Sequence, residues 1–238
     1  METRRSDLLH DFYGMEPSDY PSLPTPRRIE KNGWEIFEGS CESFSYKTVS
    51  AGEIQKFDGE RKMRLSSCVS EIISEYIGHP RSLLAAGIGN RYIAADSVGP
   101  LVCKKLAVGE VSQVKLTAIS PGTPAQTGID TSRLVSIAAE SEVADVVLTI
   151  DSLCASKTER LLSIIQVSDM GLTPCSALTH TSSEISSATM PSRVVSIGVP
   201  TVFYHENKLL TTADIDASAE SISTIIAAAV NRAVFSRK

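Results

Sequence analysis

Two aspartates stand where side chains could do acid–base chemistry. Asp96 follows an apolar run at 82–88 after a short loop, and Asp151 directly follows the apolar run "DVVLTI". If the two runs are neighbouring parallel strands, both carboxylates lie at the edge where ligands bind in open α/β sheets. Two carboxylates in one crevice separate in pKa, which supplies an acid and a base at one pH. Such a pair could activate water against a peptide bond, so Asp96 and Asp151 are the candidate catalytic residues.

Other roles for these residues stay open on the sequence alone. Aspartate is a favoured helix N-cap, and each aspartate precedes an expected helix, so capping competes with chemistry. The pair could also hold one divalent metal ion with His180, because a histidine with two carboxylates suits zinc or a similar ion. A weaker candidate is a nucleophile and base formed by Cys175 and His180 in "TPCSALTH".

The glycines before Asp96 match only the start of a dinucleotide-binding loop. Gly87 and Gly89 fit the first two glycines of G-x-G-x-x-G, but Tyr92 replaces the third. The next expected strand ends in Ile-Ser-Pro instead of the acid that would bind a ribose. We therefore expect Gly89 and Asn90 to shape a tight turn that presents Asp96.

Ser168 and Asp169 follow another apolar run, "LLSIIQVS". We expect these two residues to line the same crevice and to support the substrate. Asp169 also suits a turn, because it stands in "SDMG".

The elements that must position these residues follow from hydrophobic periodicity. Apolar side chains recur at helical spacing over 60–77 and 214–235, whereas 145–150 is apolar enough for a strand covered on both faces. Expected strands and helices alternate, which predicts an α/β protein with three α/β/α layers around a mostly parallel central sheet. Weaker alternation over 33–57 predicts a small N-terminal β appendage.

Two segments follow from composition along the chain. Residues 1–30 are polar and proline-rich, which predicts a flexible leader or propeptide, and residues 31–238 are expected to form one α/β domain.

Overall composition excludes several classes of protein. The formal net charge of the 238 residues is −5, so no global basic surface for nucleic acid is expected. No apolar run approaches the length of a membrane span, and the N-terminus lacks the apolar region of a secretory signal. Five scattered cysteines without a C-x-x-C pair fit free thiols in a reducing cytosol.

Several motifs in the same order resemble the germination protease family, the spore endopeptidases of spore-forming Firmicutes. The matching stretches are "RRSDLL" (4–9), "GIGNRYIAADSVGP" (87–100), "ISPGTPAQTGID" (119–130), "DVVLTIDSLCA" (145–155), "IQVSDMGLTP" (165–174), "SIGVPTV" (196–202) and the tail at 209–234.

The resemblance implies an atypical aspartic endopeptidase that cleaves small acid-soluble spore proteins during germination. The family's two proposed catalytic aspartates match Asp96 and Asp151. The resemblance also implies a zymogen, a homotetramer, a place in the cytoplasm of the forespore or spore core, and no cofactor.

The family's core looks like that of the hydrogenase maturation proteases. In those proteins, acids at the positions of Asp96 and Asp151 bind a metal together with a later histidine, and this analogy is the basis of the metal alternative. The chain is also shorter than typical family members, and Cys175–His180 replaces a glycine-rich stretch of the family. These departures leave a third alternative open, a paralogue that keeps the fold and is catalytically inactive.

Overall fold

The computed structural model describes residues 26–111, 113–174, 183–206 and 208–236. The strands are β1 (Arg27–Lys31), β2 (Trp34–Ser40), β3 (Ser45–Ser50), β4 (Ser82–Gly87), β5 (Gly109–Val111), β6 (Val114–Ile119), β7 (Val146–Ala155), β8 (Ile164–Ser168), β9 (Arg193–His205) and β10 (Lys208–Leu210). The helices are α1 (Gly59–Ile77), α2 (Val98–Lys105), α3 (Pro124–Thr127), α4 (Thr131–Ser141) and α5 (Ile215–Phe235), with short 3₁₀ turns η2 (Ile54–Lys56), η3 (Ala94–Asp96) and η4 (Thr158–Arg160).

All described strands form a single mixed sheet. Its order is β1-β2-β3-β8-β9-β7-β4-β6-β5, and β10 pairs with β9. The pairs β6–β4, β4–β7 and β7–β9 are parallel, and every other described pair is antiparallel. The α/β fold is confirmed, but the expectation of a mostly parallel sheet holds only for these four central strands.

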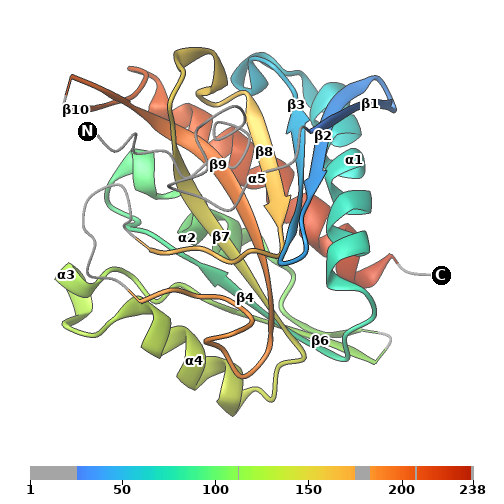
Figure 1. The fold of residues 1–238 in the computed structure, drawn as a ribbon, viewed down its shortest axis with the longest axis vertical. Helices are drawn as coiled ribbons and strands as arrows, with labels where there is room; N and C mark the ends of the chain where they lie inside the picture. The colour runs from blue at the N-terminus through green and yellow to red at the C-terminus, as the bar shows by residue number, and fades with distance from the viewer. Residues whose placement is uncertain (1–25, 112, 175–182, 207, 237–238) are drawn as a thin grey trace.

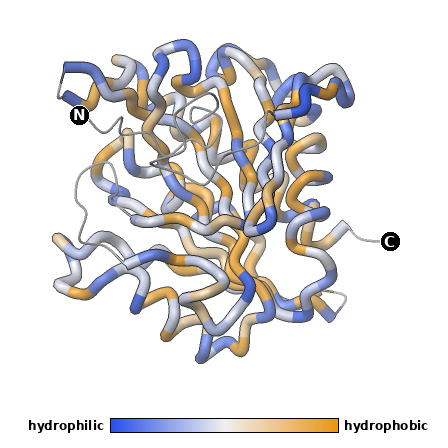
Figure 2. The backbone as a smooth tube through the Cα atoms, viewed as in Figure 1, coloured by the Kyte–Doolittle hydropathy of each residue, from blue (hydrophilic) through white to orange (hydrophobic). Residues whose placement is uncertain are grey.

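Helices cover both faces of the central strands, which confirms the three layers (Figure 1). Alternate residues of β4 point to opposite faces, as the period of a strand requires. Leu83 and Ala85 pack in the core formed with α1, α2 and α5, whereas Leu84 and Ala86 pack in the core formed with α4. Figure 2 shows apolar residues along the central strands.

The helix predicted over 60–77 matches α1, and the helix predicted over 214–235 matches α5. The two helices pack side by side on one face of the sheet (Figure 1). Asp58 caps α1, since its carboxylate accepts a hydrogen bond from the Arg61 N–H at 2.8 Å.

The N-terminal strands extend the main sheet. Strand β3 pairs with β8, and β2 and β1 follow it outward, so the expected small appendage is continuous with the central sheet. The first strand begins at Arg27, so residues 27–30 belong to the folded part and not to the expected leader. Residues 1–25 lie outside the described part of the chain.

Among the described residues, no helix combines the length and apolar character needed to cross a bilayer.

Candidate active site

Asp151 lies where the pairing of β4 with β7 ends, and Asp96 lies in the turn η3, which contacts β7. The pairing of these parallel strands finishes at Gly87 and Ile150, and the Ile88 N–H then donates to the Ile150 carbonyl at 2.8 Å. Asp151 is the next residue along β7, while the chain after Ile88 leaves the sheet toward Asp96. The turn η3, which contains Asp96, contacts both β7 and β9. Both residues therefore belong to segments at the carboxyl end of β4, and their pairing as an acid and a base stays a prediction.

The Asp96 carboxylate folds back onto the loop that precedes it. Its Oδ2 accepts a hydrogen bond from the Asn90 backbone N–H at 2.7 Å. Gly89 has a φ of +113°, and a Cβ built there would lie 2.2 Å from the Asp96 carbonyl oxygen and 2.7 Å from Oδ1. A side chain at position 89 would therefore displace Asp96, which explains the glycine without a nucleotide.

Burial raises the pKa of Asp96 to about 6, and the hydrogen bond from Asn90 opposes that rise. Taking a carboxylate out of water disfavours its charged form, whereas a donated N–H favours it. A carboxyl group with this pKa is still partly protonated close to neutral pH, so it is suited to give a proton.

Asp151 lies inside β7 with 8% of its surface exposed. Its Oδ1 accepts a hydrogen bond from the Ser152 N–H at 2.7 Å, a contact that stabilises negative charge. The paired residue on β9 is Gly198. Asp151 therefore presents a buried carboxylate from a rigid strand.

The competing role of helix capping is wrong for both aspartates. Helix α2 starts at Val98 with Ser97 before it, and the Asp96 carboxylate bonds upstream to Asn90 instead of to the helix. Asp151 is followed by four more strand residues, so it precedes no helix.

The turn η3 is held from β9 as well as from its own loop. The buried Thr201 hydroxyl donates to the Ala95 carbonyl at 2.5 Å. Sequence reasoning missed Thr201, although it belongs to the "SIGVPTV" stretch that the resemblance singled out.

Most of the chain is similar to a known protein family. Residues 28–206 match the family model described as germination protease. The chain belongs to the germination protease family.

Individual relatives carry the same description. A germination protease of Bacillus licheniformis is 37% identical over 141 residues, which are 54% of this chain and 38% of that protein. One of Bacillus subtilis is 31% identical over 190 residues, which are 73% and 51% of the two chains. One of Clostridium perfringens is 31% identical over 170 residues, or 66% and 52%. The chain thus spans about half the length, or less, of these relatives.

Among solved structures, a nickel–iron hydrogenase maturation protease from Thermococcus kodakarensis aligns with a TM-score of 0.43 and 16% identity. The alignment covers 67% of this chain and 98% of that chain. The family resemblance in the sequence predicts a core like that of this class of protein. The α/β architecture itself is established by the sheet and helices described above.

Ser168 and Asp169 do not join the aspartate pair of this germination protease family member. Strand β8 runs antiparallel to β9, so its carboxyl end points back toward the amino end of β7. Ser168 is level with Ser196 of β9, two residues before the partner of Asp151. This register does not support the expectation that both residues line the crevice of the aspartate pair, because β8 runs antiparallel to β9.

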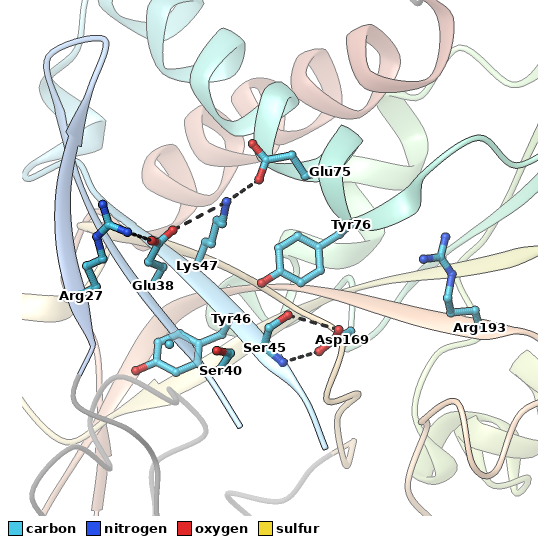
Figure 3. A pocket seen from close by; sticks show the side chains of 11 residues that line it. Arg27, Glu38, Ser40, Ser45, Tyr46, Lys47, Glu75, Tyr76, Asp169 and Arg193 are labelled. Atoms are coloured by element: carbon cyan, nitrogen blue, oxygen red, sulfur yellow. Dashed lines mark hydrogen bonds and ion pairs between the residues drawn. The ribbon is translucent and has the colours of Figure 1, made fainter. Parts of the chain in front are cut away.

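Asp169 instead lines a separate cavity of about 620 Å³ between the N-terminal strands and α1 (Figure 3). Its carboxylate accepts hydrogen bonds from the Ser45 N–H at 2.6 Å and from the Ser45 hydroxyl at 3.2 Å. Arg27, Glu38, Lys47 and Glu75 form a chain of ion pairs across that cavity (Figure 3).

The metal alternative has two of its three ligands in the described part of the chain, Asp96 and Asp151. His180 and Cys175 lie outside the described residues. Among the residues that are described, no group of three or more His, Cys, Asp or Glu side chains is placed to hold a metal ion.

Proposed function

We propose that this chain is an endopeptidase that cleaves peptide bonds with the Asp96 and Asp151 carboxyl groups as its acid and base. The observation that carries the proposal is that Asp151 follows the last β4–β7 pair and that the turn containing Asp96 contacts β7, in a member of the germination protease family. We assign the acid to Asp96, whose pKa is raised by burial, and the base to Asp151.

Asp151 is the general base in this proposal. Its carboxylate takes a proton from a water molecule, whose oxygen then attacks the carbonyl carbon of the substrate. The Ser152 N–H stabilises the charged form that this step requires. The rigid strand position keeps the carboxylate in place, which favours the attack geometry.

Asp96 is the general acid. As the tetrahedral intermediate collapses, the carboxyl group gives its proton to the departing amide nitrogen and the C–N bond breaks. The raised pKa of Asp96 keeps that proton available. After the products leave, Asp151 holds a proton and Asp96 is charged, and one proton transfer between them through water restores the starting state.

The substrates that we propose are small acid-soluble spore proteins, cleaved in the cytoplasm of the forespore or spore core during germination. Family membership supports this choice, since the relatives are named germination proteases. A zymogen form, assembly into a homotetramer and the absence of a resident cofactor belong to the same proposal.

The test is cleavage of a purified small acid-soluble spore protein, followed on a gel, with Asp96→Asn and Asp151→Asn made separately. We expect each variant to lose activity by about 10²-fold or more, the usual contribution of a positioned acid or base. Full activity in either folded variant would refute the pair.

The matched control is Asp145→Asn at the opposite end of the same strand pair. The Asp145 carboxylate accepts hydrogen bonds from the backbone N–H groups of Arg81 at 2.7 Å and Ser82 at 3.1 Å. It is exposed and remote from the proposed chemistry. We expect this variant to keep the wild-type rate, measured below its own thermal unfolding temperature.

A further inference from the structure

We propose that Gln126 is a positioning residue for Asp96 and that it acts through Asn90. The inference rests on the proposed function, because it gives a second loop a part in setting the geometry of the acid. The loop that carries Gln126 follows β6, the other parallel neighbour of β4.

Asn90 connects the two loops by using its backbone and its side chain separately. The backbone N–H donates to the Asp96 carboxylate at 2.7 Å. The side-chain Oδ1 accepts two hydrogen bonds, from the Tyr92 N–H at 3.0 Å and from Gln126 Nε2 at 2.9 Å. Fixing the side chain of Asn90 therefore also fixes the direction of its N–H toward Asp96.

The amide group of Gln126 contacts two residues, Thr123 through Oε1 and Asn90 through Nε2. Its Oε1 accepts a hydrogen bond from the Thr123 N–H at 3.0 Å, which closes the start of α3. Its Nε2 is thereby directed at Asn90. One end of the amide holds its own short helix, and the other end holds the loop of the acid.

The consequence for Asp96 is geometric. Gly89, with its positive φ, lies against the Asp96 carboxylate. A glycine gives little conformational resistance of its own. The contacts from Tyr92 and Gln126 supply the restraint that this part of the loop lacks. Without the Gln126 contact, we expect the orientation of the Asn90 N–H to vary, and the Asp96 carboxyl group to lose its fixed orientation as a result.

Gln126→Glu is the decisive variant because it separates the two contacts. Glutamate keeps an oxygen that accepts from the Thr123 N–H, so α3 keeps its cap, but it has no N–H to give to Asn90. Gln126→Ala removes both contacts. Thr127→Ala is the loop control, since the Thr127 hydroxyl contacts Thr123 and Ile129 and not Asn90.

We expect kcat to fall roughly five- to tenfold in both Gln126 variants, the effect of losing one hydrogen bond. KM changes less than about twofold if only the acid is misplaced. Amide hydrogen exchange at Asn90, measured by NMR without substrate, becomes faster by a similar factor of roughly five to ten. Thr127→Ala keeps the wild-type kcat and the wild-type exchange at Asn90.

Restoration of wild-type kcat and Asn90 exchange by Gln126→Glu would show that only the cap of α3 matters, and would overturn the inference. If Gln126→Glu is fully active and Asp96→Asn is inactive, the inference about Gln126 fails and the proposed function is still supported. Full activity in Asp96→Asn would instead reject the proposed function, and the exchange at Asn90 would still report whether Gln126 orders the Asp96 loop.

Discussion

An aspartate near each end of the β4–β7 strand pair accepts hydrogen bonding from the backbone, and the two aspartates differ in pKa. Asp145, at the amino end, is exposed, and the N–H groups of Arg81 and Ser82 lower its pKa. Asp96, at the carboxyl end, receives one N–H, and burial raises its pKa to about 6.

This contrast shows how one residue type serves two purposes in a single fold. Two N–H donors and nearby water stabilise the charged form of the Asp145 carboxylate, which then links the start of β7 to the start of β4. One donor with little water leaves the carboxyl group ready to hold a proton. Burial, and not residue type, separates the proposed acid from the structural aspartate.

The largest expected effect comes from changing the glycine against the acid. In Gly89→Ala, the new Cβ would meet the Asp96 carbonyl oxygen and Oδ1, so the acid must move. We expect kcat to fall by about 10²-fold or more, in line with loss of a general acid.

The matched change is Gly128→Ala, at a positive φ of +71° with no atom within 4 Å of the added Cβ. This variant carries backbone strain of about 1 kcal/mol but leaves Asp96 alone. Equal losses of activity in the two variants would show that strain, and not contact with Asp96, is responsible.

The next effect is on stability as a function of pH. The folded pKa of Asp96 is raised from an unfolded value near 4 to about 6. The contribution of Asp96 to the free energy of unfolding is therefore largest below about pH 4 and is lost as the pH rises through about 6. The loss is roughly 3 kcal/mol. Asp96→Asn removes this slope, so the variant is expected to gain stability over wild type at pH 7.

Urea unfolding of wild type and Asp96→Asn at pH 4 and pH 7 measures the difference. The comparison with Asp145 would break if the Asp96→Asn variant showed the same pH slope as wild type between these values.

A smaller effect of opposite sign is expected at Asp145. Its pKa is lowered in the folded state, so its contribution to stability is present above the unfolded pKa and is lost as pH falls through the folded pKa. Asp145→Asn should therefore lower the melting temperature at pH 7, with the gap closing as the pH falls through the lowered folded pKa. A gap that persists unchanged in acid would contradict this account.

The smallest expected effect is that of a chelator. If Asp96 and Asp151 act without a cofactor, exhaustive dialysis against EDTA leaves the rate of cleavage of a spore protein unchanged. Loss of activity that zinc restores would favour the alternative in which both carboxylates and His180 hold a metal ion.

The direction of β8 follows from the length of the connection between β7 and β8. Only eight residues, 156–163, separate β7 from β8, and a parallel crossover needs a dozen or more. That limit makes β8 run back past the level of Asp151, so Asp169 lies toward the amino end of β7. Apolar content identified the strand, but it carries no information about its direction.

Sequence patterns predicted the main helices and the buried strands, and they singled out the two aspartates as candidates. Helical periodicity marked α1 and α5, and apolar runs marked β4 and β7, because side-chain spacing records which face is buried. Asp96 and Asp151 followed from the rule that parallel strands present their carboxyl ends together.

Only the tertiary structure decided the burial of Asp96, its contact with Asn90, and the link from Gln126. These depend on residues that are distant in the chain, and hydrogen-bond geometry at a loop junction leaves no periodic signal in a sequence. Local spacing fixes what each segment is, whereas the charge state of a carboxyl group depends on how much water the rest of the fold leaves around it.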